Sequence, residues 1–197
     1  MKRIILASAS PRRKELLEKL GLKFEVVPGL CPEEIIPGLT AHELARRISL
    51  EKAMVVAEKH KDSLVIAADT LGFLDGNVIG KPKTEAEACR MLENLSGKWH
   101  RVVTGFSIMD TSAGKSLSRS VETRVLMKNL TPAAIHDYVK TGEPLDKAGG
   151  YAIQGLGSAL IERIEGDYYN VVGLPLKAVC DAFREFGIEA SFEPGDR

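Results

Sequence analysis

Residues 3–13 read RIILASASPRR, and this stretch decides how the chain begins to fold. Its apolar first half predicts a buried strand, which breaks into a short turn rich in serine. Ser10 is a favourable N-cap, and Pro11 suits the first position of a helix. The pattern therefore predicts a strand, a tight turn and a helix that opens with Arg12 and Arg13.

Two adjacent arginines are unfavourable at the start of a helix, because that end already carries partial positive charge and free backbone N–H groups. They become favourable if an anion binds there, and a phosphate is the anion that suits both guanidinium groups and helix N-termini. The alternative is that two surface arginines simply follow a turn, and the local sequence alone leaves the two interpretations evenly balanced.

The composition limits the classes of protein that need consideration. The chain has 197 residues, 44% hydrophobic and 27% charged, which suits one globular domain or two tightly joined lobes. Its formal net charge is zero, so we expect no nucleic-acid partner. The sequence shows neither an apolar run long enough to span a membrane nor a secretory signal, so we expect no membrane partner and a cytoplasmic protein. Its three cysteines lack metal-ligand spacing and are expected to be reduced thiols.

Strand and helix patterns alternate along the chain, and strand pairs interrupt the alternation. This order favours an α/β or α+β sheet of mixed direction. We expect capping boxes at Thr40 and Thr84 to open helices that reach about residues 60 and 95. The expected strands are 23–27, 64–69, 100–110, 115–127, 159–164 and 188–192, with a hairpin over 73–79. Further helices are expected at 131–139 and 174–186. A loop is expected at 28–39, and fraying from residue 193.

Several charged residues are candidates for chemistry. Asp69 follows an apolar run, at the end of a predicted strand, where a carboxylate can accept a proton or hold a divalent metal. Lys81 lies between a glycine and a proline and can meet a phosphate, although most such lysines are solvated. Lys52 lies within the second helix, where a surface lysine is the more ordinary interpretation. Glu33 and Glu34 could complete a metal site with Asp69 or form an exposed acidic loop.

Residues 142–157, GEPLDKAGGYAIQGLG, contain five glycines, which indicates unusual backbone angles or close approach of a ligand. Gln154 lies within this stretch and carries both a donor and an acceptor, as the reading of a base edge requires. A structural glycine-rich hairpin is the alternative. The P-loop and GxGxxG motifs are absent, as is the Gly-x-Ser-x-Gly elbow, so a P-loop NTPase, a Rossmann dehydrogenase and an α/β-hydrolase are disfavoured.

Together these motifs resemble the Maf family of nucleoside triphosphate pyrophosphatases, also called septum formation inhibitor proteins. The resemblance covers nearly the whole chain in order. It rests on LASASPRR at 6–13, Lys52, AADT at 67–70, GKP at 80–82, SGKWHRVVTG at 96–105, GEPLDKAGGYAIQG at 142–155 and NVVGLP at 170–175.

The resemblance implies a Maf/ITPase-like α/β fold: a single domain over residues 1–197 with a mixed, elongated, twisted sheet flanked by helices, and two lobes around a central cleft. It also implies cleavage of a nucleoside triphosphate to the monophosphate and pyrophosphate, a divalent cation such as Mg²⁺ or Mn²⁺, a cytoplasmic setting and a homodimer.

The resemblance also assigns roles to individual residues. By this resemblance, Asp69 corresponds to the proton acceptor. The chemistry of the residues themselves adds metal coordination as an alternative role of Asp69, with Glu33 as a candidate second ligand. The Asp-Thr pair at 69–70 resembles the branch acting on dTTP and UTP, since the sister branch active on 7-methyl-GTP has glutamine after the aspartate. Ala152 departs from the family pattern, in which many relatives have glycine. Arg12, Thr70 and Gln154 correspond to specificity positions, and Ser8, Arg13, Lys52 and Lys81 to phosphate-pocket positions.

We therefore expect a dTTP/UTP pyrophosphatase. One alternative is a non-catalytic nucleotide-binding regulator of cell division, as the older family name suggests. Another is a housekeeping enzyme whose true substrates are modified pyrimidine nucleotides.

Overall fold

The computed structural model describes residues 2–190, apart from the side chain of Asp146. Its first elements are those that the opening stretch predicts: strand β1 (Arg3–Leu6), a turn, and helix α1 (Pro11–Glu18). The side chain of Ser10 caps the helix by accepting a hydrogen bond of 3.4 Å from the backbone N–H of Arg13. The expected strand–turn–helix unit is confirmed.

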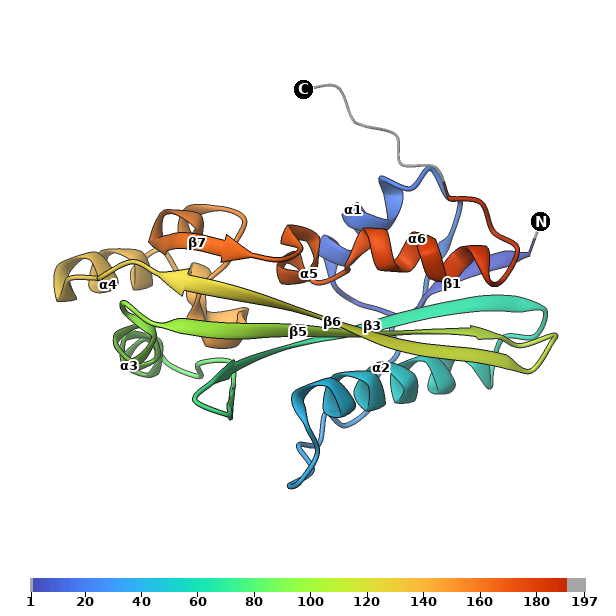
Figure 1. Ribbon diagram of the computed structural model, residues 1–197, viewed down its shortest axis with the longest axis horizontal. Helices are drawn as coiled ribbons and strands as arrows, with labels where there is room; N and C mark the ends of the chain where they lie inside the picture. Colours follow the sequence, from blue (N-terminus) through green and yellow to red (C-terminus); the bar gives the residue numbers. More distant parts are fainter. Residues whose placement is uncertain (1, 191–197) are drawn as a thin grey trace. The chain divides into compact units, whose positions relative to one another are not determined.

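The remaining elements follow in an order close to the expected one (Figure 1). The strands are β2 (Glu25–Val26), β3 (Ser63–Leu74), β4 (Asn77–Ile79), β5 (Trp99–Asp110), β6 (Lys115–Met127) and β7 (Ile161–Glu165). The helices are α2 (Ala41–Ala57), α3 (Glu85–Leu95), α4 (Pro132–Val139), α5 (Tyr168–Val172) and α6 (Leu176–Arg184), with short 3₁₀ turns η1 (Glu143–Asp146), η2 (Ala148–Gly150) and η3 (Leu156–Leu160).

The described strands form one mixed sheet with the order β2-β1-β3-β5-β6-β7, and β4 pairs with β3. β1 pairs in parallel with both β2 and β3, whereas the β3–β4 and β6–β7 pairs are antiparallel. The sheet and its flanking helices confirm the expected mixed α/β class.

Some boundaries are shifted: α2 ends at Ala57 rather than about residue 60, and β7 begins at Ile161 rather than 159. Three larger differences from the expected elements remain. Asp69 does not end its strand, because β3 continues through Leu74 to pair with β4 across the Asp75-Gly76 turn. Helix α5 and the three 3₁₀ turns were not predicted, because they are too short to show helical periodicity. Residues 188–190 are not a strand; the rest of the expected strand, and the expected fraying from 193, lie outside the described residues.

The described chain divides into two compact units, and the long strands contribute residues to both. The first unit comprises residues 2–70, 104–121 and 173–190, and the second comprises 71–103 and 122–172. In the first unit, α2 covers one face of the strands while α1 and α6 lie on the other (Figure 1). Small and branched side chains of β1, α2 and β3 form a core there. In the second unit, α3, α4, β5 and β6 enclose a separate core. The expectation of one domain with two lobes stays a prediction.

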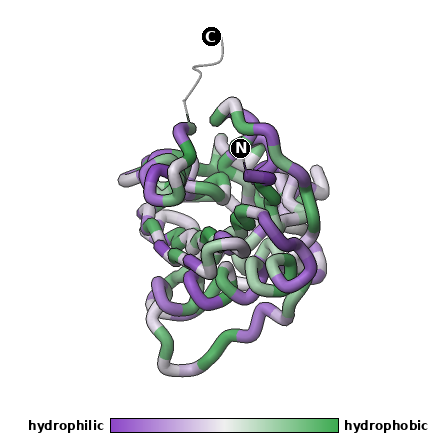
Figure 2. Tube along the Cα trace, turned by 90° about the vertical axis from the view of Figure 1, so that its right-hand side faces the viewer, coloured by the Kyte–Doolittle hydropathy of each residue, from purple (hydrophilic) through white to green (hydrophobic). Residues whose placement is uncertain are grey.

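Glycine permits α2 to lie close against its neighbours. A Cβ atom at Gly105 of β5 would overlap the backbone carbonyl of Ala45 in α2. A Cβ atom at Gly29 would come within 2.6 Å of the carbonyl oxygen of Lys52. The absence of a side chain thus lets α2 lie close to the sheet at Gly105 and to the preceding loop at Gly29. That loop carries hydrophobic as well as hydrophilic stretches (Figure 2), and Leu30 and Ile35 within it are exposed.

None of the helices among residues 2–190 has the combination of length and apolar character needed to cross a membrane.

Candidate active site

A buried lysine joins two carboxylates in the first unit. The Nζ atom of Lys52, in α2, donates to Oδ1 of Asp69 and to Oε1 of Glu33, and both distances are 2.6 Å. Lys52 is 8% exposed and Asp69 is 4% exposed, whereas the Glu33 side chain, in the loop before α2, is about half exposed. The ordinary interpretation of Lys52 as a surface lysine is therefore wrong, and the predicted residues Glu33, Lys52 and Asp69 lie together.

Local sequence explains why these three side chains meet. Thr40 and Glu43 form the complete capping box that was expected, so α2 begins at Ala41 and points Lys52 into the first unit. Gly29 lets the preceding loop approach the backbone of Lys52, which brings Glu33 within reach. Asp69 continues the fully buried run of β3 and is held by the pairing of that strand.

Asp69 keeps one oxygen for further chemistry. Its Oδ2 atom is buried and has no hydrogen-bond partner among the described residues. An unsatisfied buried oxygen of a carboxylate is costly, and such atoms mark places where a water, a cation or a substrate group belongs. The geometry therefore suits Asp69 to accept a hydrogen bond or a proton at Oδ2 while Lys52 stabilises its charge through Oδ1.

Arg13 lies across the same part of the first unit. Its Nε donates to the carbonyl of Gly173 at 2.9 Å and its Nη2 donates to Oγ1 of Thr70 at 3.1 Å. The Thr70 hydroxyl also contacts that of Thr104 at 2.9 Å. Desolvation lowers the pKa of Arg13, while the negative charges of Asp69 and Glu33 oppose that shift. These bonds use two of the five N–H groups of the guanidinium, and the others suit an anion.

The turn between β1 and α1 is held by serine hydroxyls. The Oγ atom of buried Ser8 accepts a hydrogen bond of 3.1 Å from the backbone N–H of Ser10. Arg12 lies in the first turn of α1 and is partly buried. Thus Ser8 orders the predicted anion-binding turn, whereas Arg12 and Arg13 supply its positive charge.

The carboxylates of Asp69 and Glu33 fit a magnesium or manganese ion for which the substrate would supply further ligands. They lie on the same ammonium group, and Oδ2 of Asp69 is unpartnered within residues 2–190. In the described part of the chain, no group of three or more His, Cys, Asp or Glu side chains is placed to hold a metal. Magnesium is commonly bound by one or two carboxylates together with substrate phosphates, so a two-carboxylate set is sufficient. Glu34 is exposed.

Lys81 and Gln154 belong to the second unit. The exposed turn that carries Lys81 lies beside the glycine-rich stretch, because the N–H of Gly149 donates to the carbonyl of Gly80 at 2.9 Å. Gln154 is partly buried at the far end of that stretch. Within this unit the structure therefore brings together the GKP motif and the segment that leads to Gln154.

A buried histidine outside the predicted site residues supports the same stretch. His100, on β5, is buried, and its Nε2 lies 2.6 Å from the hydroxyl of Tyr151. Burial lowers the pKa of His100 to about 4 and raises the pKa of Tyr151. The signal for this pair is present in the sequence, since His100 lies within SGKWHRVVTG and Tyr151 within AGGYAIQG. Their contact is visible only in the fold.

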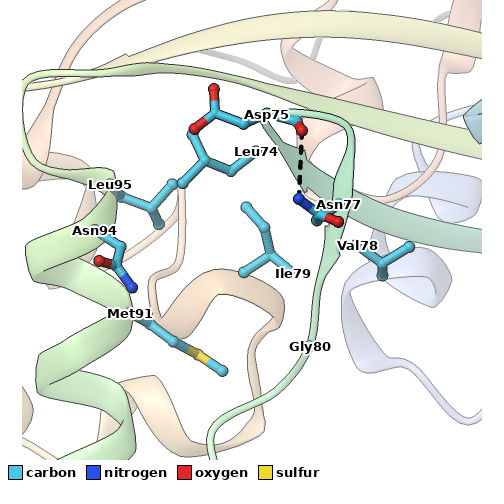
Figure 3. A pocket seen from close by; sticks show the side chains of 9 residues that line it. All are labelled: Leu74, Asp75, Asn77, Val78, Ile79, Gly80, Met91, Asn94 and Leu95. Carbon is cyan, nitrogen blue, oxygen red and sulfur yellow. Dashed lines mark hydrogen bonds between the residues drawn. The ribbon is translucent and has the colours of Figure 1, made fainter.

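A pocket of about 280 Å³ in the second unit is a separate feature (Figure 3). It lies between the β3–β4 hairpin, including Leu74 and Ile79, and the α3 residues Met91 and Leu95. No lysine or arginine occurs among the described residues that line it, and Asp75 adds negative charge. The pocket is therefore unsuited to a triphosphate, and none of the predicted site residues lines it.

Known proteins are similar to this chain over nearly its whole length, and the family model that matches it is the one that its motifs resemble. The family model described as "Maf-like protein" matches residues 3–186. The chain belongs to the Maf family. The match spans all the predicted site residues, from Ser8 to Gln154.

Curated relatives of this Maf protein are similar along their full length. A protein of Desulforamulus reducens is 47% identical over 96% of this chain and 99% of its own. A protein of Caldicellulosiruptor bescii is 48% identical over 96% of this chain and 97% of its own. Both are named dTTP/UTP pyrophosphatase.

A solved structure, that of the Staphylococcus aureus Ham1 protein, has a similar fold. It aligns with a TM-score of 0.50 and 16% sequence identity, covering 81% of this chain and 80% of that chain. At this identity the likeness concerns the fold alone.

Proposed function

We propose that this protein is a nucleoside triphosphate pyrophosphatase that hydrolyses dTTP and UTP to the monophosphate and pyrophosphate. The observation that carries the proposal is the full-length similarity, at 45–48% identity, to proteins named dTTP/UTP pyrophosphatase. The buried Lys52–Asp69 pair supports it, because it supplies a charged oxygen in a protected position.

The reaction needs a water molecule to attack the α-phosphorus. Asp69 orients that water through Oδ2 and accepts its proton as the new P–O bond forms. The bond between the α-phosphorus and the α,β-bridging oxygen breaks, and its electron pair leaves with pyrophosphate. Lys52 holds the carboxylate in place and stabilises its negative charge before the proton arrives. General-base catalysis of this kind contributes about 10²–10⁴-fold to a rate.

Charge balance explains why further cations are needed. A nucleoside triphosphate carries about four negative charges near neutral pH. Among the five charged site residues of the first unit, the charges of Lys52 and Arg13 are formally matched by those of Asp69 and Glu33, so Arg12 adds the net positive charge. The roles of Arg12, Arg13, Ser8 and Lys81 as nucleotide-binding residues rest on the resemblance and on the donors that they carry.

A divalent cation, magnesium or manganese, is part of the proposal. Asp69 and Glu33 would hold it, and when bound it supplies positive charge to the phosphates. Removal of divalent cations with EDTA should abolish pyrophosphate release, and added Mg²⁺ or Mn²⁺ should restore it. Full turnover in excess EDTA would contradict the metal requirement.

The central test is the substitution Asp69→Asn, which keeps the shape of the side chain and removes its basicity. We expect pyrophosphate release from dTTP to fall at least about 100-fold while thermal unfolding stays cooperative. The matched control is Glu34→Gln, which neutralises an exposed carboxylate of the nearby loop and should retain activity. Near-normal turnover of Asp69→Asn would reject the assigned role.

Specificity is proposed to depend on Arg12, Thr70 and Gln154. Gln154→Ala should reduce the preference for dTTP and UTP over other nucleotides, as measured by kcat/KM for each. An unchanged ranking of substrates would show that Gln154 does not read the base.

The alternative functions make different predictions for the same assays. A non-catalytic nucleotide-binding regulator of cell division would bind nucleotides and release no pyrophosphate from any of them. An enzyme for modified pyrimidine nucleotides would cleave dTTP and UTP with lower kcat/KM than the modified compounds. The buried basic–acidic pair favours an enzyme over the regulator.

A homodimer and a cytoplasmic location are also part of the proposal. Exposed apolar side chains in the first unit, among them Leu30, Ile35 and Met54, are a source of buried area for a second copy. Cys31, Cys89 and Cys180 are all free thiols, which suits a reducing compartment. Light scattering in solution tests the first point, and a monomer at all concentrations would contradict it.

A further inference from the structure

The loop that carries Gln154 is closed by a small hydrogen-bonded cluster in the second unit. The N–H of Ala152, before Gln154, donates to the hydroxyl of Tyr138 at 3.2 Å. After Gln154, the N–H groups of Leu156 and Gly157 donate to the carboxylate of Glu143 at 3.1 and 2.8 Å. Both sides of the loop are thus fixed by side chains from outside it.

The two anchoring side chains are joined to each other. The hydroxyl of Tyr138 donates to Oε1 of Glu143 at 2.8 Å. Tyr138 is 6% exposed and its ring packs in the core of the second unit, so its hydroxyl has a fixed position. Glu143 follows α4 across Gly142, whose φ of 76° turns the chain back towards the loop. Burial opposes ionisation of Glu143, but its hydrogen bonds together with the charge of Lys147 outweigh burial, and the pKa of its carboxyl is lowered.

Glycines make this closure possible. A Cβ atom at Gly157 would lie 2.5 Å from the carbonyl oxygen of Ala152 and 2.6 Å from the Tyr138 hydroxyl. A Cβ atom at Gly155 would lie 2.6 Å from Oε2 of Glu143. The backbone at 157 therefore lies directly against that at 152, and residues 153–156 form a closed loop between them.

Discrimination by a glutamine depends on such a fixed loop. A primary amide can present either its N–H or its oxygen to the same group by rotating. Thymine presents an acceptor at O4 where cytosine presents a donor at N4. A mobile glutamine adapts to both edges, whereas a glutamine on a rigid backbone can favour one of them.

We infer that Glu143 and Tyr138 are positioning residues that set base selectivity by holding the loop at 152–157, and with it Gln154. The inference rests on the proposed function and names a device within it. Neither residue needs to touch the nucleotide.

The experiment compares Tyr138→Phe and Glu143→Gln with the matched control Tyr168→Phe, which removes a hydroxyl from an exposed tyrosine. Tyr138→Phe keeps the ring and its packing, so folding should be retained, as judged by thermal unfolding. We expect the ratio of kcat/KM for dTTP to that for dCTP to fall about tenfold in Glu143→Gln, and less in Tyr138→Phe, mainly through KM. Tyr168→Phe should leave it unchanged.

A double variant separates positioning from general destabilisation. In a Gln154→Ala background, Tyr138→Phe should change the ratio no further, because both substitutions act through one loop. Amide hydrogen exchange should also accelerate at Leu156 and Gly157 in Glu143→Gln. Unchanged selectivity and exchange in folded variants would overturn the inference.

The outcomes also separate the inference from the proposed function. If the wild type binds dTTP in preference to dCTP but releases no pyrophosphate, the proposed enzymatic function is rejected. The preference for dTTP over dCTP in each variant is then measured as a ratio of dissociation constants, which still tests the inference. If turnover is normal and selectivity is unchanged in every variant, the function stands and the inference fails. Absence of any preference in the wild type would also overturn the inference.

Discussion

The buried pair of His100 and Tyr151 should make the stability of this protein sensitive to mild acid. Burial lowers the pKa of His100 to about 4 in the folded state, whereas an exposed histidine in the unfolded chain has a value of 6.5. As the pH falls below 6.5, the unfolded chain takes up the proton first. The contribution of His100 to stability is therefore fully present above pH 6.5 and is lost as the pH falls towards 4.

The size of the effect follows from the two pKa values. Their difference corresponds to a loss of about 3 kcal/mol well below pH 4, of which about 2 kcal/mol is already lost at pH 5. This is a large share of the 5–15 kcal/mol that stabilises an ordinary domain, as a rough guide. His100 is 2% exposed, so solvent screens this effect little.

Urea unfolding at pH 7.5 and pH 5.0, followed by fluorescence of the single tryptophan Trp99, measures the effect. Other carboxylates also titrate, so the wild type is compared with His100→Gln, which cannot take up the proton. The stability difference between them should shrink by about 2 kcal/mol at pH 5.0. His136→Gln, at an exposed histidine of α4, serves as the control and should show no such change. A difference that stays constant between the two pH values would refute the reasoning.

Two further predictions concern the first unit and the packing of α2. Gly105→Ala should destabilise the protein by about 3 kcal/mol or more in urea unfolding, because the added methyl overlaps the carbonyl of Ala45. Gly80→Ala is the control and should cost far less, because its added methyl meets open space. Equal stabilities of the two variants would contradict the close approach of α2. Lys52→Met should cost about 3 kcal/mol, because it leaves the Asp69 carboxylate buried without its counter-charge, and adding Asp69→Asn should recover part of that loss. A double variant no more stable than Lys52→Met would show that the charge pair is not the source.

The strand, turn and helix over residues 3–18 show how much local sequence can decide. The apolar run of β1, the cap at Ser10 and the proline after it act over a few residues, so their outcome needed no tertiary information. The capping box at Thr40 is equally local and begins α2 where it was expected. Thr84 forms only half of the expected capping box. Its hydroxyl accepts a hydrogen bond from the backbone N–H of Glu87, but the Glu87 carboxylate accepts one from the N–H of Lys83 instead of that of Thr84.

Lys52 shows where local reasoning fails. Its neighbours in sequence are those of an ordinary helix. Nothing among them indicates that its Nζ atom lies 2.6 Å from each of two carboxylate oxygens. Asp69 was expected to end a strand, because the apolar run stops there. Pairing with other strands carries β3 five residues further, and pairing energy depends on partners that are distant in sequence.

The sequence by itself determined the mixed α/β class, most helix starts, the family and the residue types available for phosphate chemistry. These follow from periodicity, from caps and from motifs, each of which acts within a short window of the chain. Only the tertiary structure decided that Lys52 joins Asp69 to Glu33, that Arg13 bonds to Thr70 and Gly173, and that Glu143 closes the loop of Gln154. Hydrogen bonds, including those between charged groups, need donor and acceptor within about 3 Å, and their strength depends on burial. Only the fold can therefore set which side chains meet and how dry their surroundings are.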